Sequence, residues 1–212
     1  MRWLRRHAGL IVAVAAAGVV VAVAPVRAGA PLEQLRLQVD RVLKLLDDPE
    51  LKKESKAKER RAAVRKVADD IFDFGETAKR SLGRHWAART PEEREEFVKL
   101  FGDLLERSYI SKIELYGGEK IQYVGDRIEG DTAAVQSKLL TKTGSEVPIE
   151  YRMLRKSDRW LVYDVVIEGV SLVANYRTQF NKIIQTSSFQ DLVKKMKTRQ
   201  EELGAAASPR LG

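Results

Sequence analysis

The sequence predicts an α+β fold, in which several helices pack against a curved, four-stranded antiparallel sheet. Two observations predict this class. Apolar residues recur every three to four positions between residues 32 and 115 and again after residue 170, as in helices with one buried face. Between residues 120 and 167 they recur every second position, as in strands with one buried side. Helices gathered before and after a block of strands are typical of α+β rather than α/β folds.

Three helices are expected before residue 84. The first spans residues 32–46 and ends before Pro49, because proline cannot continue a helix. The second spans residues 52–72, and its many charges form a solvated face opposite an apolar stripe. A short third helix covers residues 76–82 and ends at Gly83.

A fourth helix has the clearest start in the sequence, at Thr90-Pro91-Glu92-Glu93. The threonine and the second glutamate form a capping box, in which each side chain accepts a hydrogen bond from the other residue's backbone N–H. Pro91 takes the first helical position, where a missing N–H costs nothing. A broad apolar face follows at residues 97–109, and we expect the helix to reach about residue 115.

The period-two segment predicts four strands, separated by turns at residues 129–131, 143–145 and 157–158. Parallel neighbours would need a crossover of a dozen or more residues, so strands joined this closely form an antiparallel meander. The residues expected to share one side of the sheet are Ile121, Tyr123, Ala133, Val135, Ser137, Leu139, Val147, Ile149, Tyr151, Met153, Leu161, Tyr163, Val165 and Ile167.

After Gly169 the helical period returns and predicts two more helices. The first has an apolar side from Leu172 to Ile184, and the second spans residues 189–203. Residues 204–212 are small and polar, as in a disordered tail. Residues 29–203 are therefore expected to form a single domain.

Residues 1–28 have the three parts of a cleavable signal peptide. Three arginines precede an uncharged run at residues 8–24, and small residues stand at cleavage spacing in residues 26–28. The run is shorter than the roughly 20 apolar residues of a membrane span. An uncleaved anchor is the alternative, because residues 28–30 offer a second, poorer cleavage site. We expect export and a mature chain that begins near Gly29.

Charge and cysteine content exclude several functions. Removing residues 1–28 takes away four arginines and no acidic residue, which lowers the formal charge from +8 to +4. This mild excess does not indicate nucleic acid, and it is compatible with contact with anionic lipid head groups. The absence of cysteine excludes disulfides, thiolate nucleophiles and cysteine metal ligands. Stability must come from a packed core, for which one domain of this length suffices.

The sequence offers few candidates for catalysis. Residues 169–173 follow the G-x-S-x-G nucleophile elbow for three positions and then depart from it, since Val173 replaces the second glycine. Ser171 fits a helix N-cap better than a nucleophile. Outside the signal peptide the one histidine is His85, which fits a surface or packing role. No acidic or histidine cluster has metal-ligand spacing, so we expect no catalytic residue, no metal and no cofactor.

Asp164 and Glu168 are the remaining pair of interest. On a strand their side chains would share one side, roughly 13 Å apart. This is wider than the ~6.5–9.5 Å between the carboxyl groups of inverting glycosidases. The alternative is that one or both pair with cations such as Arg177 or Lys182 and fix the last strand to the next helix.

Three segments resemble one known family. They are residues 71–74 (IFDF), residues 82–86 (LGRHW) and, above all, residues 160–180 (W-x-V-Y-D-V-x-x-E-G-V-S-L-x-x-N-Y-R-x-Q-F). Together with the helix at residues 97–109, they resemble the MlaC family, also called toluene-tolerance proteins. The resemblance runs in order over about residues 32–200.

The resemblance implies a function and its partners. Members of the family are periplasmic carriers that hold a glycerophospholipid by its acyl chains in an apolar cavity between sheet and helices. They shuttle it between an inner-membrane ABC transporter complex with MCE-domain subunits and an outer-membrane lipoprotein bound to porin. The resemblance thus implies a monomeric carrier of phospholipid without enzymatic activity. Some relatives handle hopanoids or other lipids instead, and the sequence leaves this alternative cargo open. The rival functions are a lipid-modifying hydrolase that uses Ser171 and His85, and a structural adaptor with a filled core.

Apolar patterning and the resemblance together predict the cavity wall. Gly169 would let the chain turn after the last strand, and Asp164, Glu168 and Arg177 would brace the wall. The residues expected to contact lipid are Phe97, Phe101, Leu104, Leu105, Tyr109, Tyr123, Val135, Leu139, Ile149, Tyr151, Met153, Leu161, Tyr163, Val165, Val170, Leu172, Val173 and Tyr176. Burial of acyl chains would stabilise the complex by ~0.8 kcal/mol per CH₂. Because this contact is not specific, the protein would discriminate poorly between different acyl chains.

Overall fold

The computed structural model describes residues 30–114 and 116–206. The predicted signal peptide at residues 1–28 and the part of the predicted tail after Ala206 lie outside these residues. Six α-helices and a five-stranded sheet make up the described chain. The helices are α1 (Ala30–Asp47), α2 (Ala57–Ile71), α3 (Phe74–Leu82), α4 (Pro91–Glu114), α5 (Leu172–Thr186) and α6 (Phe189–Ala206).

The helix starts follow local capping signals. In the predicted capping box of α4, Thr90 N donates to Glu93 Oε2 at 3.0 Å and Glu93 N donates to Thr90 Oγ1 at 3.2 Å. Ser171 caps α5, because its Oγ accepts from Ala174 N at 3.0 Å. Asp73 caps α3 by accepting from Glu76 N at 3.0 Å, so this helix begins two residues earlier than predicted.

The sheet contains β1 (Lys120–Glu129), β2 (Thr132–Leu140), β3 (Glu146–Lys156), β4 (Arg159–Ile167) and β5 (Val170–Ser171), in that order and all antiparallel. The predicted meander is confirmed, but β5 was not predicted. Glu168 and Gly169 take positive φ angles of 50° and 81°, which turn the chain so that Val170 pairs with Ile167. A strand of two residues is too short to show a period.

A β-bulge changes which residues of β4 face the helices of the core. Val162 pairs with Met153 and Asp164 pairs with Arg152, so Tyr163 has no partner on β3. Val162 therefore shares a side with Val165, and the two pack in one hydrophobic cluster. The prediction that Leu161 and Tyr163 share that side is wrong, because strict alternation does not hold across a bulge.

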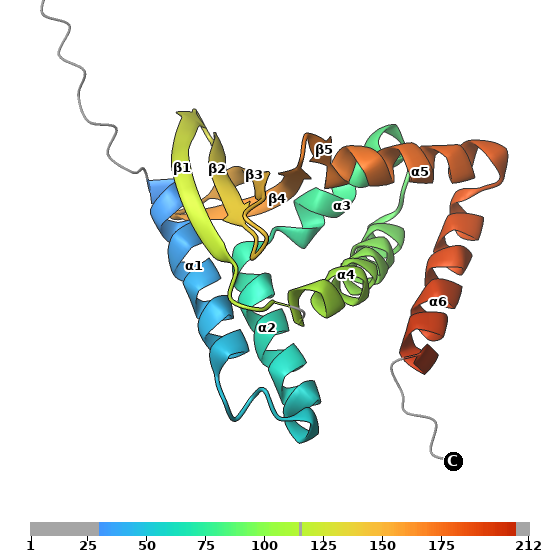
Figure 1. Ribbon diagram of the computed structural model, residues 1–212. Helices are drawn as coiled ribbons and strands as arrows, with labels where there is room; N and C mark the ends of the chain where they lie inside the picture. The colour runs from blue at the N-terminus through green and yellow to red at the C-terminus, as the bar shows by residue number, and fades with distance from the viewer. Residues whose placement is uncertain (1–29, 115, 207–212) are drawn as a thin grey trace, which may run out of the picture.

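The core divides into two clusters, whose helices and strands lie on the left and on the right of Figure 1. The sheet cluster joins one side of the sheet, hereafter the inner face, to α1 and α2. The helix cluster joins α3, α4, α5 and α6. The buried residues of the sheet cluster are Leu32, Leu35, Val67, Ile71, Ala133, Val135, Met153, Trp160 and Val162. Those of the helix cluster are Ala78, Leu82, Phe97, Leu100, Phe101, Leu105, Phe180, Phe189, Leu192, Val193 and Met196.

Aromatic rings dominate the helix cluster. The Phe101 ring meets the Tyr176 ring edge-on at 4.9 Å and the Phe180 ring edge-on at 5.2 Å. Phe97 packs on both Phe101 and Phe180. These contacts link α4 to α5 across the molecule. Among residues 30–114 and 116–206, no helix is both long and apolar enough to cross a membrane.

Candidate functional site

The inner face of the sheet is apolar and incompletely covered. Val135, Tyr151 and Val165 form one row across three strands, and Ser137, Ile149 and Ile167 form the next. Val135 is fully buried, yet its neighbours Tyr151 and Val165 stay only partly buried. The structure thus brings seven of the residues predicted to contact lipid onto one face, and these are Tyr123, Val135, Leu139, Ile149, Tyr151, Met153 and Val165.

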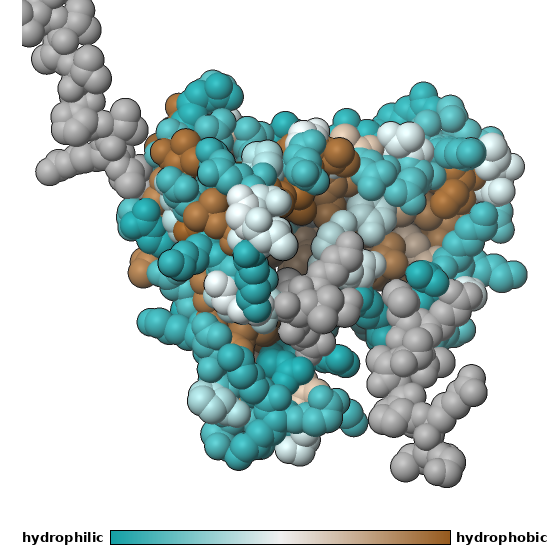
Figure 2. Space-filling model, in the orientation of Figure 1, coloured by the Kyte–Doolittle hydropathy of each residue, from teal (hydrophilic) through white to brown (hydrophobic). Residues whose placement is uncertain are grey.

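A second group of partly buried side chains borders the helix cluster. Leu104 and Tyr109 come from α4, and Leu172 and Tyr176 come from α5. Burial raises the pKa of Tyr109 and of Tyr176 above the ordinary value, and Tyr176 raises that of Tyr109 further. Figure 2 shows hydrophobic surface in a hollow at the centre of one face of the molecule, between the sheet and the helices on the right of Figure 1.

Other residues predicted to contact lipid lie elsewhere. Phe97, Phe101 and Leu105 are at most 8% exposed and fill the helix cluster. Tyr163 lies under the guanidinium of Arg80 on α3, 4.0 Å from its ring centre, and Leu161 is also outside the sheet cluster. These side chains support the fold rather than form an accessible wall.

Val170 and Val173 also depart from the predicted wall, in opposite directions. Val170 is 62% exposed at the turn between β4 and β5. Val173 is 2% exposed, and its backbone N–H is bound to Asp164. A charge placed at Val173 would therefore disturb the fold itself, whereas the same change at Val170 would be solvated.

Asp164 joins β4 to the start of α5. It is 3% exposed and accepts hydrogen bonds from Ser171 Oγ at 2.6 Å and from Val173 N at 3.0 Å. Its cation is Arg152, whose Nη1 lies 3.3 Å from Asp164 Oδ2. Asp164 thus pairs with a cation, as predicted, but the cation is Arg152 and not Arg177 or Lys182.

Strand register explains the choice of Arg152, because this residue stands directly opposite Asp164 on β3. Arg177 turns instead toward α3, where its Nε donates to the Arg80 carbonyl at 2.9 Å. Glu168 is exposed and sits in the turn that precedes β5. Of the predicted bracing residues, Asp164 thus makes the buried contacts, and Gly169 provides the turn.

The two candidates for hydrolytic chemistry are engaged with other groups. The Ser171 hydroxyl donates to Asp164 and caps α5. His85 Nε2 lies 3.0 Å from Asn181 Oδ1, which also accepts from Arg84. Within residues 30–114 and 116–206, no group of three or more histidines or acidic residues could hold a metal ion.

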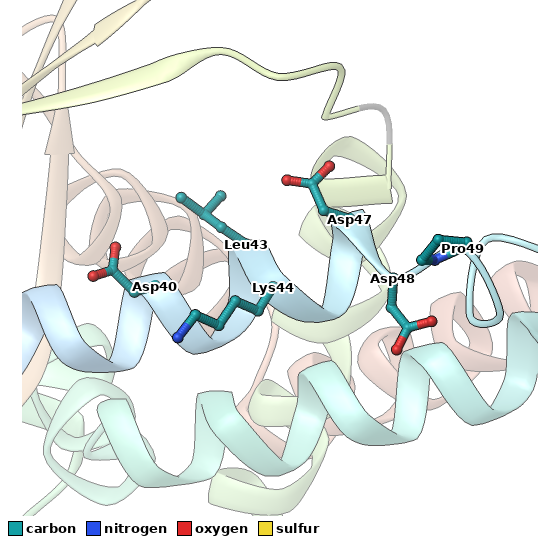
Figure 3. Close-up of a pocket in the computed structure, with 6 residues that line it drawn as sticks. All are labelled: Asp40, Leu43, Lys44, Asp47, Asp48 and Pro49. Carbon is teal, nitrogen blue, oxygen red and sulfur yellow. The ribbon is translucent and has the colours of Figure 1, made fainter.

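Two surface grooves are lined mostly by charged residues, which makes them poor candidates for an acyl-chain site. One, of about 410 Å³, lies along the second half of α1, and the residues that line it are Asp40, Leu43, Lys44, Asp47, Asp48 and Pro49 (Figure 3). The other, of about 400 Å³, lies between α4 and α6 and is lined mostly by charged side chains such as Glu96 and Lys197. The apolar candidate site is therefore the inner face of the sheet and the helical side chains that border it.

Sequence reasoning placed Tyr123, Ser137 and Tyr151 on this face, but it did not predict that hydroxyl groups would be buried there. The Tyr123 hydroxyl and Ser137 Oγ are buried without a hydrogen-bond partner. Burial raises the pKa of Tyr123 and of Tyr151 above the ordinary value. A serine within an apolar period-two stretch was the available sign, since a buried hydroxyl is costly unless something binds it.

Comparisons with known proteins assign the chain to a family. A family model described as "MlaC protein" matches residues 37–198. The Intermembrane phospholipid transport system binding protein MlaC of Haemophilus influenzae is 29% identical over 120 residues, which are 54% of this chain and 56% of that protein. The chain thus matches about half the length of this curated relative.

A solved structure is similar over most of the chain. It is the phospholipid-binding protein from Ralstonia solanacearum, in complex with a phospholipid. The TM-score is 0.72 and the sequence identity is 26%, over 83% of this chain and 99% of that one.

Proposed function

Because the chain belongs to the MlaC family, we propose that it is a phospholipid carrier that holds a glycerophospholipid by its acyl chains against the inner face of the sheet. The observation that carries the proposal is the incomplete cover of this face. A protein that needs only a filled core would bury Ile149, Tyr151 and Val165 as completely as it buries Val135. The phospholipid complex of the Ralstonia protein supports the same ligand class.

The proposed cargo fits the physical character of the site. Apolar contact stabilises each buried CH₂ by ~0.8 kcal/mol, so two acyl chains need few specific contacts. In this proposal, side chains from β1 to β4 form one wall, and Leu104, Tyr109, Leu172 and Tyr176, which border the helix cluster, form the other. Such a site binds and releases its cargo unchanged, so the proposal includes no enzymatic step.

The carrier would work in the periplasm, after export directed by residues 1–28. Its proposed partners are an inner-membrane ABC transporter complex with MCE-domain subunits and an outer-membrane lipoprotein bound to porin. The name of the Haemophilus relative, an intermembrane transport system binding protein, supports this placement. The mildly basic mature chain is compatible with transient contact with anionic membrane surfaces.

Lipid loading tests the proposal. The mature protein, purified natively and extracted with organic solvent, should yield close to one phospholipid per chain by mass spectrometry. A protein without lipid that also fails to take phospholipid from vesicles would contradict the carrier function. Conversion of the phospholipid to a hydrolysed product would favour the hydrolase.

Two valines offer a matched pair of variants. Val165→Glu places a carboxylate on the inner face, where an unpaired charge is costly against hydrocarbon, and should abolish loading. Val170→Glu makes the same change at a 62% exposed position and should leave loading unchanged. Equal loading of both variants would show that the inner face does not hold the lipid.

A further inference from the structure

Three hydroxyl groups interrupt the apolar inner face on three adjacent strands. Tyr123 on β1 stands directly opposite Ser137 on β2, and Tyr151 on β3 is a diagonal neighbour of Ser137 on the same side. Ser137 is 2% exposed. The Tyr123 hydroxyl and Ser137 Oγ have no hydrogen-bond partner. The cluster formed by these three residues is named the hydroxyl cluster below.

The surroundings of the hydroxyl cluster are mainly apolar. Val135 and Met153, both buried, lie on the same face. The charged groups nearby come from α1, where the Arg36 guanidinium lies 5.1 Å from the centre of the Tyr123 ring and Asp40 raises the pKa of Tyr123. Arg36 is itself 3.7 Å from Glu33, which offsets its charge.

A buried hydroxyl without a partner is a cost that an apolar residue of the same shape would avoid. Phenylalanine and alanine fit the same strand positions, so the fold alone gives no reason for the buried hydroxyls of Tyr123 and Ser137. Burial also keeps the phenols protonated, because it raises the pKa of Tyr123 and of Tyr151. The cluster therefore offers neutral O–H donors in a dry place, where an additional neutral acceptor could use them.

We propose that Tyr123, Ser137 and Tyr151 form a polar subsite that donates hydrogen bonds to an ester carbonyl of the bound lipid. This inference rests on the proposed carrier function and adds to it a polar contact that recognises the ester linkage of the lipid. An ester carbonyl is the uncharged acceptor that a diacyl lipid carries next to its acyl chains. A phosphate would instead need cations that are free to pair with it, and Arg36 already lies near Glu33.

The subsite also links loading to a change of structure. The Tyr123 hydroxyl and Ser137 Oγ have almost no accessible surface, so lipid reaches them only when the elements that cover the inner face separate. The closed, lipid-free form then leaves the hydroxyls unpaired, and the loaded form pairs them. Loading is therefore favoured by polar contacts as well as by acyl burial.

The test compares two lipids that differ only in the carbonyl groups. Delipidated mature protein is offered dioleoyl phosphatidylethanolamine and its dioleyl diether analogue in equal amounts, and the bound lipids are quantified by mass spectrometry. The wild type should favour the diester at least about fivefold, which corresponds to roughly one net hydrogen bond. Equal loading would overturn the subsite and leave the carrier function standing, whereas loading of neither lipid would contradict the carrier function itself.

Variants assign the preference to the hydroxyl cluster. The triple variant Tyr123→Phe, Ser137→Ala, Tyr151→Phe should load the two lipids equally and the diether as well as the wild type does. Tyr163→Phe is the matched control, because Tyr163 lies outside the sheet cluster against Arg80, and it should keep the wild-type ratio. A preference that survives in the triple variant would overturn the proposal.

Folding of the variants is measured separately. Delipidated triple variant should melt close to the wild-type temperature, since the Tyr123 and Ser137 hydroxyls that it loses are buried without a close hydrogen-bond partner, although Ser137 also interacts with the Tyr151 hydroxyl. If the triple variant is too unstable to load, Ser137→Ala alone carries the test and should lower the diester preference at least about twofold. An unchanged ratio in Ser137→Ala would then count against the subsite.

Discussion

The substitution Asp164→Asn should loosen the junction between β4 and α5. The carboxylate holds this junction through Ser171 Oγ, Val173 N and Arg152 Nη1, all of which are donors. An amide keeps one acceptor oxygen, and its NH₂ group would face one or two of these donors. The substitution therefore removes hydrogen bonds while it changes the volume of the side chain very little.

The size of the effect follows from the burial of each partner. Hydrogen bonds to a charged group contribute about 1.5–3 kcal/mol each. Asp164 is 3% exposed, but the Arg152 side chain is 42% exposed and can be solvated again, which places its loss at the low end. We expect a decrease of about 2–4 kcal/mol in the free energy of unfolding. For a domain of this length this lowers Tm by about 5–15 °C.

Urea unfolding of the delipidated protein, followed by circular dichroism, measures the change. Glu150→Gln is the matched control, since it removes a carboxylate that also binds Arg152, at 2.9 Å, from a partly exposed position. This control should cost less than about 1 kcal/mol. If Asp164→Asn costs no more than the control, the buried carboxylate does not anchor α5 and the reasoning from its contacts is refuted.

Three further predictions concern stability. Ser81→Ala should leave the protein as stable or up to about 1 kcal/mol more stable in urea unfolding, because Ser81 Oγ is buried without a partner; a loss above 1 kcal/mol would contradict this. Thr90→Ala should lower the free energy of unfolding by about 1 kcal/mol through loss of the α4 cap, and an unchanged midpoint would contradict it. Burial raises the pKa of Tyr123 and of Tyr151 above the ordinary 10.0, so their contribution to stability is complete below pH 10 and is lost as pH rises above it. Thermal unfolding from pH 8 to 11 should show this decline, and the doubly Tyr→Phe protein should show a smaller one.

The sequence alone determined the features that depend on neighbouring residues. The capping box of Thr90 and Glu93, the Ser171 cap and the turn at Gly169 involve groups at most four positions apart, so local geometry suffices to predict them. The periods of two and of three to four residues are equally local, and they yielded the helices and the four long strands. The family resemblance likewise rests on short sequence segments, at residues 71–74, 82–86 and 160–180.

Only the tertiary structure decided which of the apolar residues remain accessible. Phe97 and Tyr151 both stand at apolar positions of a periodic segment, but Phe97 packs against rings from α5 and α6 while Tyr151 lies on the incompletely covered inner face. The bulge at Tyr163 and the pairing of Asp164 with Arg152 likewise depend on the register between β3 and β4. Register and cover are set by contacts among distant segments. A one-dimensional pattern reports that a side chain is apolar, and the packing of the whole chain determines what lies against it.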